Sequence, residues 1–210
     1  MSRASAVTAH RVLSGVVLGA AMALCAAAWH LGTERTGDGT AYFYEVFDIG
    51  HPGIVTAVTS MALIAVAVLS VVLGLGTGLA PWFVNALLFV VLAADNVLRL
   101  HNQVPAGDVV ARLIYWALLA WLLVRLRPLL RRVHGRWLLV VGLVLLAMGE
   151  LLDLIGNDGH DAAAVLEESL GCVGAWALAM ALVGVTLSTM TVAPQVMSHT
   201  DGSGPVAASD

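Results

Sequence analysis

The twenty residues from Ile54 to Leu73, IVTAVTSMALIAVAVLSVVL, contain no charged side chain. A helix of this length rises about 30 Å, which matches the hydrocarbon core of a bilayer. The rest of the chain is similar: 60% of its 210 residues are hydrophobic, 11% are charged, and the mean hydropathy is +0.90. Water-soluble domains carry about 25% charged residues. The composition therefore excludes a soluble domain and predicts an all-α, polytopic transmembrane helix bundle.

Five more apolar stretches are long enough to cross a membrane, so we expect six spans. Their approximate ranges are 12–31, 54–73, 81–100, 109–126, 137–155 and 165–187. The fourth is short, but the arginines near its ends can reach the headgroups and still let it span. The spans form one domain over residues 1–192. Residues 193–210 are rich in Gly, Ser, Pro and Ala, and we expect them to form a disordered cytoplasmic tail.

Arginine indicates the orientation. Seven of the ten arginines precede the first span or lie between residues 125 and 136. Because cytoplasmic loops carry such an excess, we expect both termini in the cytoplasm of a multi-pass protein of the cell (inner, cytoplasmic) membrane. The apolar part of the first span exceeds a usual signal-peptide core, so we expect this helix to be retained.

Small residues indicate how the helices associate. Gly15, Gly19, Ala23 and Ala27 recur at every fourth position of the first span. Helices in lipid associate through close contact at small side chains. This stripe predicts tight packing within the bundle, with a homodimer through Gly15 and Gly19 as the alternative.

Tryptophan, arginine and histidine indicate the contacts with the bilayer surface. Trp29, Trp82 and Trp137 fall at span ends, where an interfacial aromatic belt is expected. The arginines between residues 125 and 136 attract anionic lipid headgroups. Nucleic acid is not an expected partner, because no soluble module carries these arginines. His10 lies on the cytoplasmic side and is expected to be solvated.

Ionisable residues within apolar helices are costly, and here they gather at one depth. In the six-span topology, twelve of the fourteen acidic residues and three of the ten arginines fall on the outer side. Seven residues at this level, contributed by the third, fifth and sixth spans, form our candidate site for a proton, a metal ion or a small polar ligand. They are Asp95, Arg99, His101, Glu150, Asp153, Glu167 and Glu168.

Structural roles compete with function at these positions. Asp95 and Arg99 have the four-residue spacing of an ion pair on one helix face. Glu167 and Glu168 stand in the opening turns of a helix, where the macrodipole favours negative charge.

Glu150 and Asp153 are harder to explain structurally. They lie toward the carboxyl end of the fifth span, where the helix dipole disfavours anions. They therefore need a compensating partner: Arg99, Arg112, a histidine, a bound cation or protons.

A divalent metal is a candidate cofactor, with His51, His101 and His160 as candidate ligands on the outer side. Neither an HExxH motif nor an ordered Cys/His spacing supports it. The only cysteines, Cys25 and Cys172, lie in apolar stretches and form neither a CxxC site nor a disulfide framework.

The stretch Asp95-Asn96-Val97-Leu98-Arg99-Leu100-His101-Asn102 resembles a motif of uncharacterised bacterial polytopic membrane proteins. Those proteins carry an Asp-Glu pair late in a helix and then a Leu-His-Glu. A Glu-Glu pair opens a later helix, as Glu167-Glu168 does here. In this chain Asn96 and Asn102 replace both glutamates of the first motif. The resemblance implies a shared architecture and brings no activity.

Three functions stay open. The first is binding or transport at the outer polar site. The second is a non-catalytic accessory or assembly subunit, whose polar residues only fix helix packing. The third is an intramembrane, metal-dependent lipid hydrolase, for which carboxylates and histidines near the headgroups would activate water. The lack of a ligand motif disfavours an enzyme.

Overall fold

The computed structural model describes residues 3–36, 54–98, 107–130, 135–155 and 162–197, and these ranges contain helices but no strand. The helices are α1 (Arg3–Thr36), α3 (Ile54–Thr77), α4 (Ala80–Leu98), α5 (Gly107–Leu130), α6 (Arg136–Ile155) and α7 (Ala162–Met197). Each of the six expected ranges overlaps one of these helices, and the last two residues of the range 81–100 lie outside the described part of the chain. The first and last helices are longer than the expected spans, and α7 continues past residue 193.

Four described segments are long and apolar enough to cross a membrane: Ala4–His30, Ile54–Thr77, Ala80–Leu98 and Val165–Met190. Helices satisfy their backbone hydrogen bonds internally, which the lipid interior requires. The fold is therefore that of a helical membrane protein.

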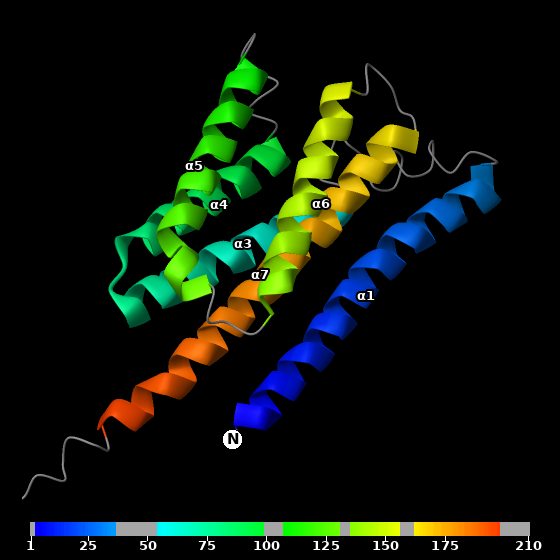
Figure 1. Ribbon diagram of the computed structural model, residues 1–210. Coiled ribbons are helices and arrows are strands. Elements are labelled where there is room, and N and C mark those ends of the chain that lie inside the picture. Colours follow the sequence, from blue (N-terminus) through cyan, green and yellow to red (C-terminus); the bar gives the residue numbers. More distant parts are fainter. Residues whose placement is uncertain (1–2, 37–53, 99–106, 131–134, 156–161, 198–210) are drawn as a thin grey trace, which may run out of the picture.

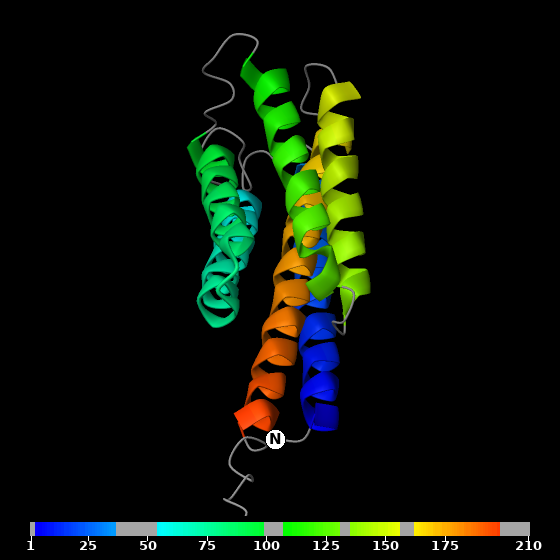
Figure 2. The same cartoon turned by 60° about the vertical axis from the view of Figure 1, so that its left-hand side comes forward.

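Successive helices run in opposite directions (Figures 1 and 2). The start of α1 and the end of α7 lie together at one end of the bundle, which we call the terminal end. At the other end, which we call the far end, α1, α4 and α6 finish and α3, α5 and α7 begin. The polar residues of the candidate site belong to the far end.

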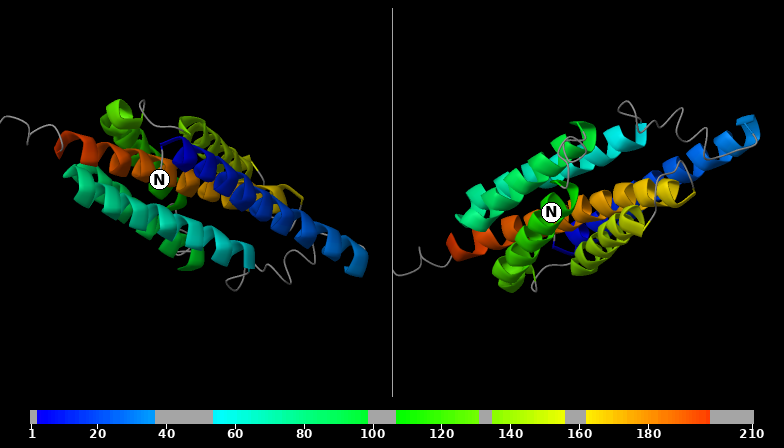
Figure 3. Two further views of the ribbon diagram at one scale, coloured as in Figure 1. Left: turned by 90° about the horizontal axis from the view of Figure 1, so that it is seen from below. Right: turned by 90° about the horizontal axis from the view of Figure 1, so that it is seen from above.

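Helix α7 is the central helix. It packs against α6, α3 and α1, and it lies between the α3–α4 hairpin and the α1–α6 side when the bundle is seen from below or from above (Figure 3). Two thirds (67%) of its apolar span is buried, against 22% of that of α1. Ala175, Ala177 and Ala179 are completely buried. Such small side chains let several helices approach α7 closely.

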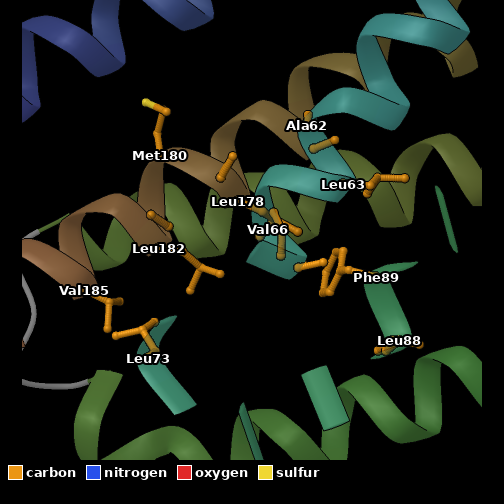
Figure 4. Close-up of a cluster of buried hydrophobic side chains, with 14 of the residues drawn as sticks. Ala62, Leu63, Val66, Leu73, Leu88, Phe89, Leu178, Met180, Leu182 and Val185 are labelled. Atoms are coloured by element: carbon orange, nitrogen blue, oxygen red, sulfur yellow. The ribbon is translucent and has the colours of Figure 1, made fainter. Parts of the chain in front are cut away.

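The largest buried cluster joins α3, α4 and α7 (Figure 4). Val66 of α3 faces Phe89 of α4, and Leu73 lies near Leu182 and Val185 of α7. These side chains are at most 5% exposed.

Trp82 belongs to this same cluster and is only 1% exposed. The expectation that it joins an interfacial belt is therefore wrong, because α4 begins against the core rather than at a lipid-facing surface. Its indole N–H has no hydrogen-bond partner among the described residues. Trp29 and Trp137 are 40% and 60% exposed, as side chains in a belt would be.

Glycines bring α6 and α7 together. A Cβ added at Gly142 would lie 2.9 Å from the carbonyl oxygen of Gly174, and one added at Gly174 would lie 3.0 Å from that of Gly142. The two backbones thus approach in a way that only glycine permits. By contrast, a Cβ at Gly15 or Gly19 would meet nothing within 4 Å. The expected packing of that stripe within the bundle is wrong, and dimerisation through it stays a prediction.

Two asparagines of α4 bind α3. The Nδ2 of Asn85 donates to the Ser70 hydroxyl at 2.7 Å, and the Nδ2 of Asn96 donates to the Ser60 hydroxyl at 2.8 Å. Asn96 also donates to the Thr56 carbonyl at 3.2 Å. Interhelical hydrogen bonds of this kind hold helices together in lipid, where apolar contact alone provides little driving force.

His10 connects α1 to α7 near the terminal end. Its Nε2–H donates to the Met180 carbonyl oxygen at 2.8 Å, and the residue is only 6% exposed. Gly135, with a φ of +88°, lies against the ring: a Cβ added there would meet His10 Cε1 at 3.0 Å. The expectation of a solvated His10 is wrong, because α1 extends far enough to lay this residue on the central helix.

Candidate functional site

Four of the seven predicted site residues have described side chains. Asp95 is in α4, Glu150 in α6, and Glu167 and Glu168 are in α7; all four lie toward the far end. Asp153 lies one turn after Glu150, but its side chain is outside the described part of the chain. Arg99 and His101, together with the candidate metal ligands His51 and His160, also lie outside it.

Glu150 forms an ion pair with Arg112 of α5. The Arg112 Nη1 and a Glu150 carboxylate oxygen are 3.3 Å apart, with the two side chains 21% and 47% exposed. Arg112 was one of the compensating partners that the sequence suggested for this carboxylate. The structure thus explains how Glu150 is tolerated near the carboxyl end of α6.

Tyr115 places a second polar group of α5 near the site. It follows Arg112 by three residues, so both side chains lie on one side of α5. The charge of Asp95 acts on the Tyr115 hydroxyl, so this part of α5 lies within electrostatic range of that carboxylate. Sequence reasoning missed Tyr115. Its spacing from Arg112 is the signal that could have identified it.

Helix α7 meets the site at the level of Glu150. The neighbouring Gly149 lies against the α7 backbone, where an added Cβ would be 3.3 Å from the Glu167 carbonyl oxygen. Glu168 acts electrostatically on the thiols of Cys25 and Cys172. The backbone of Glu167 therefore lies against α6, and the charge of Glu168 acts on the contact between α1 and α7.

Asn96, which replaces a glutamate of the resembled motif, binds α3 instead of facing the carboxylates. Both hydrogen bonds from its amide go to that helix. This position therefore fixes the α3–α4 hairpin, on which the neighbouring Asp95 stands.

The site can attract cations. We use the name acidic layer for Asp95, Arg112, Tyr115, Glu150, Glu167 and Glu168. Within this set four carboxylates accompany one guanidinium, so the local charge is negative. No three His, Cys, Asp or Glu side chains of the described ranges come together as metal ligands. A divalent metal thus stays a prediction.

No known protein family, characterised protein or solved structure matches this chain. The resemblance carried by residues 95–102 and by Glu167-Glu168 stays a prediction.

Proposed function

We propose that the protein is a six-span integral membrane protein that binds a small cation, either a proton or a metal ion, at the acidic layer. Helices α5 and α6, at 24 and 20 residues, are long enough to complete the six spans. The arginine distribution supports a topology with both termini in the cytoplasm of a cell-membrane protein and the acidic layer on the outer side.

One observation carries this proposal: α5 sets Arg112 against Glu150 and Tyr115 near Asp95. Carboxylates that are far apart in the sequence thereby reach one level of the bundle, where α7 adds two more. Four carboxylates against one guanidinium give this level a net negative charge, and a cleft of one charge sign raises the local concentration of cations.

Binding can be tested on the full chain in lipid nanodiscs. Isothermal titration should reveal saturable binding of Mg²⁺, Mn²⁺ or Zn²⁺ or, when the protein is titrated with acid, of a proton. The double change Glu167→Gln with Glu168→Gln should weaken that binding at least tenfold. A matched control, Asp201→Asn with Asp210→Asn, removes the same charge from the carboxyl tail and should leave the affinity unchanged.

A second candidate is a non-catalytic accessory or assembly subunit. The observation that favours it is that polar side chains hold the helices to one another: Asn96 to α3, His10 to α7, and Arg112 to Glu150. On this reading no tested ion binds saturably, and the glutamine variants change only stability. The same titration therefore separates the two functions. The lipid hydrolase gains no support from the described residues.

A further inference from the structure

The two cysteines of the chain, which the sequence leaves without a role, meet between α1 and α7. Each of the two thiols, Cys25 and Cys172, is the strongest polar neighbour of the other. Both belong to a small buried cluster with Ala21, Val55 and Val165, and they are 8% and 0% exposed. They are 147 positions apart in the sequence, so only the fold brings them together.

Two hydroxyl groups complete the surroundings of the thiols. Thr59 of α3 contacts the Cys172 thiol, and Ser169 of α7 contacts the Cys25 thiol. Each hydroxyl already donates its proton to a carbonyl of its own helix, at 2.8 Å in both cases. The hydroxyl oxygens are therefore available to accept hydrogen bonds from the two thiols.

The geometry points to a redox-active dithiol: Cys25 and Cys172 form a reversible disulfide that fastens α1 to the central helix, with a lipid-soluble quinone as the oxidant. Two cysteines that share one small buried cluster can form a disulfide when side-chain rotation brings their sulfurs to bonding distance. The two S–H bonds break and one S–S bond forms. The two electrons and two protons pass to the quinone, which becomes a quinol.

The position of the pair selects this class of oxidant. Both cysteines lie inside apolar spans, where charged or water-soluble oxidants are excluded. The α1 residues beside Cys25, Met22 and Ala26, are exposed on the surface of the bundle. A quinone dissolved in the bilayer can therefore approach Cys25 from this side.

The bond would act on a loosely held element. Helix α1 packs mainly against α7, and most of its apolar span is exposed. Oxidation would fix the position of α1 against α7, and reduction would release it.

The test uses the reduced full chain in nanodiscs, treated with a fully substituted benzoquinone, which oxidises thiols without adding to them. After denaturation, maleimide mass tags count the free thiols. The chain should lose both tags without forming dimers, yield one quinol per chain, and recover both tags after reduction.

A matched control keeps two thiols but moves one of them to the lipid-facing side: Cys25→Ser combined with Ala26→Cys. This variant should retain both tags. Three results would overturn the proposal: the unaltered chain keeps both tags, its tags are lost to links between chains, or the control is oxidised as fast as the unaltered chain.

Discussion

Replacing Gly142 with alanine tests the contact that joins α6 to the central helix. The added Cβ would lie 2.8 Å from Leu178 Cδ2 and 2.9 Å from the Gly174 carbonyl oxygen. The leucine can rotate, but the carbonyl belongs to a helix backbone, so the two helices must separate by several tenths of an ångström. Overpacking of this kind costs about 1–3 kcal/mol.

Gly19→Ala is the matched control, because the same methyl group would meet nothing within 4 Å. Alanine in place of glycine favours a helix by about 1 kcal/mol in both variants. The difference between the two variants therefore isolates the helix contact. We expect Gly142→Ala to have a free energy of unfolding lower than that of Gly19→Ala by about 1–3 kcal/mol.

Unfolding by sodium dodecyl sulfate in mixed micelles, followed by circular dichroism, measures this difference. Equal stability of the two variants would refute the close approach of α6 and α7. A destabilised Gly19→Ala would instead show that another chain covers that face, as the predicted homodimer requires.

Three more changes probe the polar contacts with the same assay. Asn96→Leu should lower the free energy of unfolding by about 1–2 kcal/mol, because interhelical hydrogen bonds in membranes are worth up to about 1.7 kcal/mol. An unchanged midpoint of the unfolding transition would argue against the hydrogen bonds from Asn96 to α3. His10→Ala should lower the free energy of unfolding by about 2–4 kcal/mol, since it removes a buried hydrogen bond and leaves a void against Gly135. A loss smaller than that of Asn96→Leu would argue against a buried His10. Arg112→Gln should change stability by less than about 1 kcal/mol, with a smaller effect at high salt, because half-exposed ion pairs are weak; a large, salt-independent loss would mean that Arg112 does more than pair with Glu150.

The helices themselves were predictable, because a run of apolar residues long enough to cross a bilayer has few alternatives to a helix. The stretch from Ile54 to Leu73 lies wholly within α3, and the gathering of acids at one end follows from where they fall in successive antiparallel helices. The Arg112 partner of Glu150 could also be suggested, since few compensating cations are available at that depth.

The packing faces could not be predicted in the same way. A four-residue repeat of small side chains shows that a helix can be approached closely, but not that a neighbour does so. Gly15 and Gly19 have the repeat without a neighbour, whereas Gly142 and Gly174 meet without belonging to one stripe. His10 and Trp82 were misjudged for a related reason. Their burial depends on where the central helix lies, which local sequence does not specify.

The placement of the acidic layer on the outer side of the membrane is the central claim, and labelling in intact cells tests it directly. In a chain carrying Cys25→Ser and Cys172→Ser, a single thiol is introduced either by Asn157→Cys, between α6 and α7, or by Ser203→Cys, in the carboxyl tail. A membrane-impermeant maleimide should label the thiol at position 157 and reach the one at position 203 only after the cells are opened. Labelling of position 203 in intact cells, with position 157 protected, would place the carboxylates on the cytoplasmic side and contradict the account.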